Sequence, residues 1–451
     1  MKVHFIAIGG SAMHNLALAL HEKGYTVSGS DDEIFDPAKS RLAAKGLLPE
    51  KIGWFPEKIT ADLDEVILGM HARADNPELL RAKELGLKIY SYPEYLYEQT
   101  KEKTRIVVGG SHGKTSTTAM IMHVLRHQNI DFDYMVGAQL DGFETMVRLS
   151  QSAKIAVFEG DEYLTSPIDP RPKFHLYRPH VGIITGIAWD HVNVFPTWEM
   201  YVEQFAIFTN LIENGGALIF CKSDKTCTSV AEIAKDSIEK IGYEAHPHTN
   251  VDGVCSLATP EGNVPLKIFG EHNLENLNAA LLACEQIGIS RSDFYAAIKE
   301  FGGAARRLQL MASTGSASVF YDFAHSPSKL RATTEAVKKQ FPNRKLYACM
   351  ELHTFSSLSK DFLEQYHGAM HDADVAYVYF NPETVKHKQL AEISENEVAA
   401  AFGDGVKVFT DNNVLVSELK KLPKQNANFL LMSSGNFGGL VVKDLAEELV
   451  K

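Results

Sequence analysis

Short apolar runs alternate with longer amphipathic stretches through most of the chain. The apolar runs cover residues 3–8, 66–68, 106–108, 155–158, 181–184, 218–220, 346–350, 375–379 and 429–432. Short runs of this kind are typical of buried parallel strands. Between many of them, apolar residues recur at helical spacing, as in residues 13–23, 117–127, 276–287 and 328–340. The alternation predicts an α/β protein with parallel sheets.

Two breaks divide this pattern into three segments. The charged stretch EQTKEKTR at residues 98–105 interrupts the alternation and is interpreted as a linker. A second break lies near Arg306, and the alternation restarts at Val319. The chain has 451 residues, whereas single cores stop growing near ~250–300 residues. We therefore predict three domains, at residues 1–100, 101–305 and 306–451.

Composition and charge narrow the class of protein. Hydrophobic residues make up 45% and charged residues 23%, as in ordinary globular proteins. No apolar run approaches the ~20 residues of a membrane span, and the start MKVHFIAIGG resembles a strand rather than a signal peptide, so we expect a cytoplasmic protein without membrane insertion. The net charge of −12 argues against a general nucleic-acid-binding surface. The five cysteines form no C-x-x-C pair and are expected to be reduced and buried.

The strongest chemical signal is the segment VVGGSHGKTS at residues 107–116, between a predicted strand and a predicted helix. Glycines let backbone N–H groups approach phosphates, and a helix N-terminus adds positive potential. Lys114, expected to be exposed, can reach the outer phosphates, and the hydroxyl of Thr115 or Ser116 can face Mg²⁺. The loop is shortened, because Val108 stands where the usual pattern has its first glycine. The alternative is a glycine-rich turn with a surface lysine.

Further segments follow in a fixed order. These are VFEGDE at 157–162, Asp190 with His191, GEHNLEN at 270–276, RRL at 306–308 and YDFAHSP at 321–327. Together with GGSHGKTS they resemble the Mur ligases. Gly9 and Gly10 after the first strand, and Gly29, Ser30 and Asp31 after the second, resemble the UDP-binding domain of the family members that act on UDP-N-acetylmuramate.

The resemblance implies a Rossmann-like N-terminal domain for the UDP-sugar and a central P-loop-type parallel sheet with flanking helices for ATP. It also implies a Rossmann-like C-terminal domain for an amino acid or peptide amine. The implied reaction is ATP-dependent: the sugar's carboxylate becomes an acyl phosphate, and the amine then displaces phosphate. A carboxylate needs this activation because it lacks a good leaving group. Cations, here Lys114 and Mg²⁺, must neutralise the two anions that meet.

The resemblance also implies roles for individual residues. Lys114, Glu159 and His191 are the expected catalytic residues, and Thr115, Glu159 and His191 the expected Mg²⁺ contacts. The expected nucleotide-binding residues are Gly110, Ser111, His112, Gly113, Lys114, Thr115, Ser116, His272, Asn273, Asn276, Arg307 and Asp322. The expected substrate-binding residues are Gly9, Gly10, Ser11, Ser30, Asp31, His71, Arg73, His325 and His353. Asn273 could also cap a helix that starts after it.

Two departures from the family pattern narrow the subfamily, and a third concerns the choice of amine. No lysine lies between His191 and Lys222, so the carbamylated lysine of several Mur ligases is absent. Gly186 replaces a family asparagine, which leaves that contact open. The segment ELHTFSS at 351–357 lacks the arginines that would suit the carboxylate of free alanine.

Three other segments resemble the murein peptide ligases: DPRPKFH at 169–175, MSSGNFGG at 432–439 and MHAR at 70–73. We therefore expect L-alanyl-γ-D-glutamyl-meso-diaminopimelate as the amine, in peptidoglycan recycling, with L-alanine as the alternative.

Two other classes of protein stay open. An inactive nucleotide-binding module would lack phosphate release that depends on the acceptor substrate. A Rossmann oxidoreductase would use Gly9, Gly10 and Asp31, but His14 stands where the third glycine of G-x-G-x-x-G is needed. The sequence carries no signal for the oligomeric state.

Overall fold

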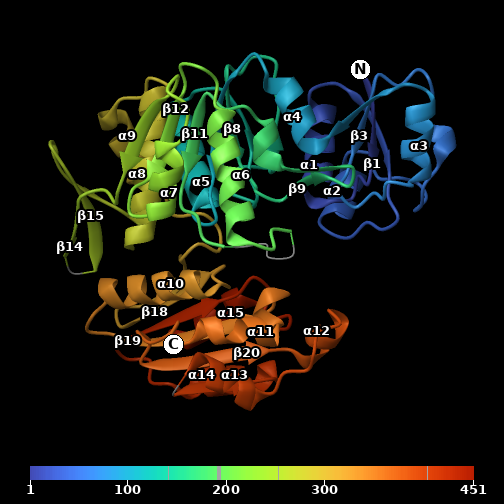
Figure 1. The fold of residues 1–451 in the computed structure, drawn as a ribbon. Helices are drawn as coiled ribbons and strands as arrows, with labels where there is room; N and C mark the ends of the chain where they lie inside the picture. Colours follow the sequence, from blue (N-terminus) through green and yellow to red (C-terminus); the bar gives the residue numbers. More distant parts are fainter. Residues whose placement is uncertain (141, 190–193, 252, 404) are drawn as a thin grey trace. The chain divides into compact units, whose positions relative to one another are not determined.

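The computed structural model describes residues 1–140, 142–189, 194–251, 253–403 and 405–451 (Figure 1). It contains three large, mostly parallel sheets with helices packed against them, which confirms the predicted α/β class. The chain packs into two compact units. The first comprises residues 1–244 and 275–298, and the second comprises residues 245–274 and 299–451. The boundaries at residues 100 and 305 stay a prediction.

The first unit begins with a four-stranded parallel sheet of strand order β2-β1-β3-β4. Its strands are β1 (Lys2–Ile6), β2 (Thr26–Ser30), β3 (Glu65–Leu68) and β4 (Lys88–Ser91), and its helices are α1 (Ser11–Glu22), α2 (Ala38–Ala44), α3 (Pro77–Glu84) and α4 (Tyr92–Thr100). Alternation of strand and helix places the loops after β1, β2 and β3 at one edge of the sheet.

The same unit contains a seven-stranded sheet of order β13-β12-β11-β5-β8-β6-β7, in which only β7 is antiparallel. Its strands are β5 (Thr104–Gly109), β6 (Phe132–Met135), β7 (Val147–Arg148), β8 (Ile155–Glu159), β11 (Val181–Ile184), β12 (Ala217–Cys221) and β13 (Glu239–Tyr243). Its helices include α5 (Lys114–His127), α6 (Trp198–Asn210), α7 (Lys225–Glu232), α8 (Glu271–Gln286) and α9 (Arg291–Ile298), of which α8 belongs to this unit from Glu275 onward. Three successive residues of the central strand β5, Ile106, Val107 and Val108, are fully buried, as expected for a sheet covered on both faces.

The second unit contains a six-stranded sheet of order β17-β18-β22-β19-β20-β21, parallel except for β17. Its strands are β17 (Gln309–Ser313), β18 (Ala317–Asp322), β19 (Lys345–Leu352), β20 (Val375–Phe380), β21 (Val406–Phe409) and β22 (Ala427–Met432). Its helices include α10 (Pro327–Gln340), α13 (Glu395–Phe402), α14 (Asn412–Lys421) and α15 (Val442–Leu449). A small antiparallel sheet of β14 (His248–Val251), β15 (Val254–Thr259) and β16 (Gly262–Pro265) belongs to the same unit.

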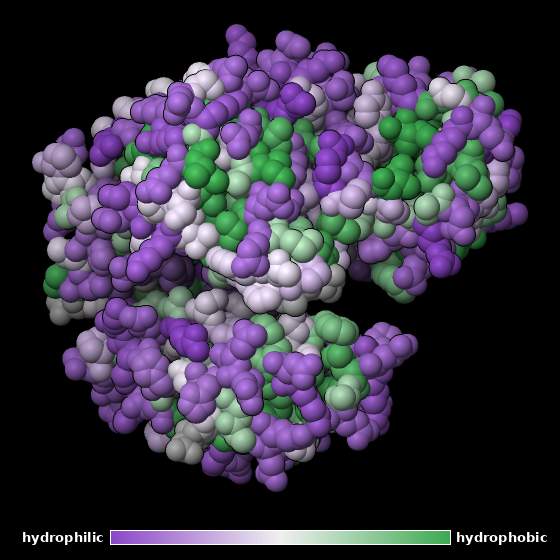
Figure 2. All heavy atoms as spheres, viewed as in Figure 1, coloured by the Kyte–Doolittle hydropathy of each residue, from purple (hydrophilic) through white to green (hydrophobic). Residues whose placement is uncertain are grey.

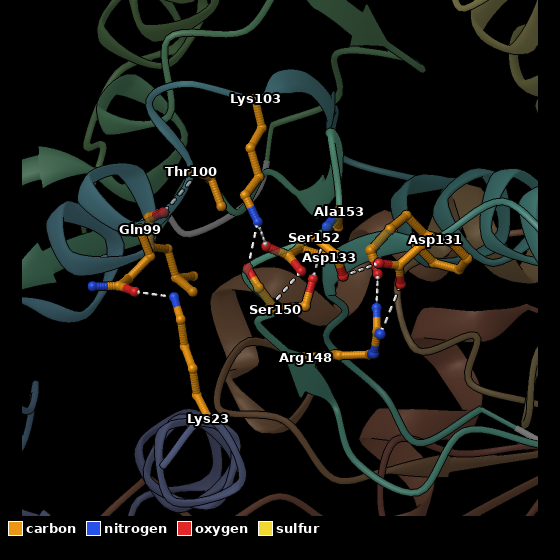
Figure 3. Close-up of polar contacts among 12 residues, drawn as sticks. Lys23, Gln99, Thr100, Lys103, Asp131, Asp133, Arg148, Ser150, Ser152 and Ala153 are labelled. Carbon is orange, nitrogen blue, oxygen red and sulfur yellow. Dashed lines mark hydrogen bonds and ion pairs between the residues drawn. The ribbon is translucent and has the colours of Figure 1, made fainter. Parts of the chain in front are cut away.

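The linker interpretation of residues 98–105 is wrong. Helix α4 continues to Thr100 and β5 begins at Thr104, so only residues 101–103 connect them. The ammonium of Lys103 pairs with the fully buried carboxylate of Asp133 and also donates to the Ser150 carbonyl, 2.7 Å away (Figure 3). The side chain of Arg105 is itself fully buried. Two of the charges that suggested an exposed linker, those of Lys103 and Arg105, therefore anchor the first strand of the second sheet.

Side chains follow the expected division between core and surface. Hydrophilic residues cover most of the face shown in Figure 2, with apolar residues in smaller patches. All five cysteines are free and buried, which confirms the prediction from their spacing. None of the helices in the described ranges combines the length and apolar character that a membrane span requires.

Candidate nucleotide and substrate sites

The predicted phosphate loop lies between β5 and α5, as the sequence indicated. Gly110 and Gly113 have φ angles of +128° and +78°, which other residues rarely adopt. A Cβ atom at Gly110 would lie 2.3 Å from Thr185 Oγ1, and one at Gly113 would lie 2.1 Å from Asn276 Oδ1. Both positions therefore need glycine for conformation and for space. The loop leads directly into the N-terminus of α5, where backbone N–H groups favour an anion.

Lys114 is the first residue of α5 and is held by the protein itself. Its Nζ donates to the Gly110 carbonyl at 2.5 Å and to Glu162 Oε2 at 2.8 Å. Burial disfavours the ammonium, but the carboxylates of Glu162, Asp161 and Glu159 outweigh burial and raise the pKa of Lys114. The lysine is thus charged, but with 14% of its side chain exposed it is not the exposed loop residue expected from sequence.

Two of the predicted Mg²⁺ contacts lie together at the carboxyl end of β8. The Thr115 hydroxyl donates to Glu159 Oε1 at 2.8 Å, and the backbone N–H of Gly137 donates to Glu159 Oε2 at 2.7 Å. His191, the third predicted contact, lies outside the described residues, as does Asp190. Hydroxyl and carboxylate oxygens are the donors that Mg²⁺ prefers, with waters completing its shell. The donor set therefore fits Mg²⁺, although the described residues contain no cluster of three or more His, Cys, Asp or Glu side chains.

Several contacts around the loop were not predicted. The Ser111 hydroxyl lies 2.8 Å from the hydroxyl of Tyr201, and the Ser111 N–H donates to the Gly186 carbonyl at 2.8 Å. Thr185 donates its hydroxyl proton to the His112 carbonyl. Gly186, the departure from the family asparagine, thus contacts the loop through its backbone. Tyr201 carries no local sequence signal, because an apolar helix with a buried tyrosine is common.

The segment 270–276 differs from its predicted form. Helix α8 already begins at Glu271, so His272, Asn273 and Asn276 lie inside its first turns rather than before it. Asn273 does not cap the helix from outside; its amide donates to the Phe269 carbonyl at 2.9 Å. Asn276 lies against Gly113 and accepts a hydrogen bond from the Thr117 hydroxyl at 3.3 Å, which brings it to the phosphate loop. Burial lowers the pKa of His272, against the opposing effect of the Asp322 carboxylate.

The predicted UDP-sugar residues gather at the carboxyl edge of the first sheet. The N–H of Gly9 donates to Asp31 Oδ2 at 2.6 Å, and the carbonyl of Ser30 accepts hydrogen bonds from Ala7 and Ile8. Burial raises the pKa of Asp31 to about 6, against the Gly9 hydrogen bond that lowers it. Gly10 and Ser11 lie at the start of α1, and His71 and Arg73 are exposed in the loop after β3. Asp31 is thus used to shape the loop after β1.

The predicted residues of the last domain lie in the second unit, at the carboxyl edge of its sheet. Asp322 ends β18, and its two carboxylate oxygens accept hydrogen bonds from the N–H groups of Leu308 and Ala324, each at 2.6 Å. The Arg307 guanidinium lies 4.7 Å from the centre of the Phe323 ring, and His325 Nδ1 lies 2.9 Å from the Phe323 carbonyl.

His353 follows β19 at the same edge. Its Nδ1 lies 3.9 Å from Glu351 Oε1. A Cβ atom at Gly435 would lie 2.7 Å from the His353 ring, so the loop after β22 approaches this histidine closely. The loops after β18, β19 and β22 therefore form one candidate substrate surface in the second unit.

Comparisons with known proteins cover the same three parts of the chain. Residues 2–104 match the Mur ligase family catalytic domain, residues 108–284 the Mur ligase middle domain, and residues 306–435 the Mur ligase glutamate ligase domain. A UDP-N-acetylmuramate–L-alanine ligase from Clostridium kluyveri is 31% identical over 379 residues, 80% of each chain. One from Lactiplantibacillus plantarum is 28% identical over 421 residues, 91% of each chain.

Two solved structures share the fold over the whole chain. A murein peptide ligase from Psychrobacter arcticus aligns with a TM-score of 0.65 and 23% identity, covering 100% of this chain and 99% of that one. The UDP-N-acetylmuramate–alanine ligase of Thermotoga maritima aligns with a TM-score of 0.70 and 22% identity, covering 100% and 98%.

The chain belongs to the Mur ligase family. It is an ATP-dependent ligase that forms carbon–nitrogen bonds in peptidoglycan synthesis.

Proposed function

We propose that this ligase joins L-alanyl-γ-D-glutamyl-meso-diaminopimelate to UDP-N-acetylmuramate, in the cytoplasmic recycling of peptidoglycan, with ATP and Mg²⁺. ATP supplies the phosphoryl group that turns the sugar's carboxylate into an acyl phosphate, with ADP as the leaving group. The peptide's amine then attacks the acyl carbon, phosphate leaves, and the amine loses a proton. Residues 1–100 hold the UDP-sugar, residues 101–305 the nucleotide, and residues 306–451 the amine.

The nucleotide half of the proposal rests on the phosphate loop. Gly110 and Gly113 open the loop to phosphates, Lys114 supplies the positive charge, and Thr115 with Glu159 would hold Mg²⁺. In such a site, positioning and charge stabilisation supply most of the catalysis. His191 and Asn276 are proposed to complete it, and Arg307 and Asp322 to contribute from the last domain.

The choice of peptide over free amino acid rests on Glu351. Its carboxylate, 2% exposed at the end of β19, accepts hydrogen bonds from the Ser433 hydroxyl and from the Phe437 N–H at 2.8 Å. A fixed negative charge at this edge repels the carboxylate of a small amino acid held close to it. The segment 351–357 offers no arginine to offset that repulsion.

Arg306, one of the arginines at this edge of the sheet, already donates to the protein's own backbone. The guanidinium of Arg306 donates to the carbonyls of Ser433 and Gly435, at 2.9 and 2.6 Å. It therefore shapes the glycine-rich loop 433–439 rather than offering a free fork to a carboxylate. A peptide can reach past the loop and place its distal carboxylates elsewhere, whereas L-alanine carries its only carboxylate next to the reacting amine.

L-alanine is the second candidate for the amine. It is favoured by the sequence relatives, since the ligases from Clostridium kluyveri and Lactiplantibacillus plantarum are both named for L-alanine.

A direct competition between the two amines tests the proposal. ADP release is measured with saturating ATP and UDP-N-acetylmuramate, with the tripeptide or L-alanine varied. We expect kcat/KM for the tripeptide to exceed that for L-alanine by at least about tenfold, because one charge-assisted hydrogen bond is worth that much. A higher value for L-alanine would establish the second candidate. If no ADP is released with the tripeptide and none with L-alanine, the acceptor or the amine class is wrong.

A further inference from the structure

Tyr201 connects three parts of the nucleotide site that lie far apart in sequence. It is fully buried on α6. Its hydroxyl lies 2.8 Å from Ser111 Oγ in the phosphate loop and 3.2 Å from Glu162 Oε1 beyond β8. Ser111 Oγ in turn lies 2.9 Å from the backbone N of Ala188, in the segment after β11. Tyr201 thus links the phosphate loop to the end of β8, and Ser111 links the loop to the segment after β11.

The hydrogen bonds have a definite direction. Tyr201 donates its single hydroxyl proton to the Glu162 carboxylate, so the Ser111 hydroxyl donates to Tyr201. The Ala188 N–H donates to Ser111 Oγ, and the Lys114 ammonium donates to the other oxygen of Glu162 at 2.8 Å. The hydrogen bonds from Ala188 through Ser111 and Tyr201, and the one from Lys114, therefore all lead to the Glu162 carboxylate. Such chains strengthen each member when the site is buried.

We propose that Tyr201 is a positioning residue for the nucleotide: it fixes Glu162, and through Glu162 the ammonium of Lys114, while it anchors the loop through Ser111. The proposal rests on the assignment of the phosphate loop to ATP. Removing the hydroxyl leaves Lys114 in place, but its carboxylate partner loses one donor and Ser111 loses its acceptor. The lysine and the loop are then less well ordered before the nucleotide arrives.

The simpler alternative is that Tyr201 only packs the core. Its ring lies against Phe195 and Phe205, with centroids 5.5 and 5.3 Å away. Tyr201→Phe keeps this ring packing and removes only the hydroxyl. Tyr177→Phe is a matched control, because Tyr177 is also fully buried in the first unit, packs 5.1 Å from Phe158, and its hydroxyl has no hydrogen-bond partner among the described residues.

The first test measures nucleotide binding and turnover in both variants of the full-length enzyme. For Tyr201→Phe we expect the Kd for ATP, from calorimetry without UDP-N-acetylmuramate, to rise about tenfold, and kcat/KM for ATP to fall at least as much. The KM for UDP-N-acetylmuramate should change less than about twofold, because its proposed site lies at another sheet. Tyr177→Phe should leave all three values unchanged. Equal effects in the two variants, or none in Tyr201→Phe, would overturn the proposal.

A double-mutant cycle tests whether Tyr201 acts through Glu162. In a Glu162→Gln background the tyrosine faces a neutral amide, so adding Tyr201→Phe should cost less than about threefold in ATP affinity instead of about tenfold. Additive losses would contradict action through Glu162. Lys114→Ala separates this proposal from the site assignment: if that variant loses ATP turnover while Tyr201→Phe binds ATP normally, the loop assignment stands and only the role of Tyr201 fails.

Discussion

The Thr115 hydroxyl donates to Glu159 Oε1 at 2.8 Å, although the two residues are 44 positions apart in the chain. The contact places an alcohol and a carboxylate oxygen side by side where β8 ends and α5 begins. Glu159→Gln should raise the Mg²⁺ concentration needed for half-maximal rate, because an amide is a weaker ligand for a hard cation. His191→Ala should do the same if the sequence prediction for that residue is correct.

The measurement is the initial rate of ADP release against Mg²⁺ concentration. Glu285→Gln is a suitable control, because that carboxylate pairs with Arg291 on the surface of the first unit. Midpoints that stay at the wild-type value in both Glu159→Gln and His191→Ala would show that the ion binds elsewhere.

Lys114→Ala should lower the turnover number by about 10²–10³, since a positioned cation is lost from a site of charge transfer. It should also lower the melting temperature, because the Glu162 carboxylate, 1% exposed, loses its charged partner. Lys114→Ala combined with Glu162→Gln should recover stability but not activity. Recovery of activity in the double variant would show that the lysine only neutralises Glu162.

The sequence predicted the strands and the phosphate loop because both depend on local pattern. Apolar runs define buried strands, and a glycine-rich turn between strand and helix defines the loop. The prediction from sequence failed at residues 98–105. A charged run predicts a solvent-exposed segment unless the residues that pair with its charges are known. Two of the acceptors of Arg105, the carbonyls of Tyr177 and Arg178, and the carboxylate of Asp133 come from other parts of the chain. Tyr201 was missed for the same reason, since its partners are 39 and 90 positions away.

Asp31 should make stability depend on pH. Its folded pKa is raised to about 6 by burial, whereas an unfolded aspartate titrates near ~3.9. The folded state therefore binds this proton more tightly, and the stabilisation present below about pH 4 is lost as the pH rises through about 6. Asp31→Asn keeps an oxygen for the Gly9 N–H and removes the charge.

Urea unfolding at pH 5 and pH 7.5 checks this expectation. The free energy of unfolding of Asp31→Asn minus that of wild type should be larger at pH 7.5 than at pH 5, meaning that the variant is relatively more stable at the higher pH. A difference that is the same at both values would show that Asp31 titrates normally in the folded protein.

Arg105 holds together the start of the seven-stranded sheet. Its guanidinium donates to the carbonyls of Thr100, Lys101, Lys103, Tyr177 and Arg178, at 2.8 to 3.0 Å. Arg105→Met keeps much of the side-chain volume but leaves these carbonyls without their donor, and each buried unsatisfied group costs about 1–3 kcal/mol. We expect a loss of at least about 3 kcal/mol in the free energy of unfolding, because several carbonyls are affected at once.

Arg291→Met is the control: Arg291 forms a surface pair with Glu285, its side chain is 56% exposed, and its loss should cost no more than about 1 kcal/mol. Urea unfolding of both variants decides the matter, and equal losses would mean that the Arg105 contacts contribute no more than an ordinary surface ion pair.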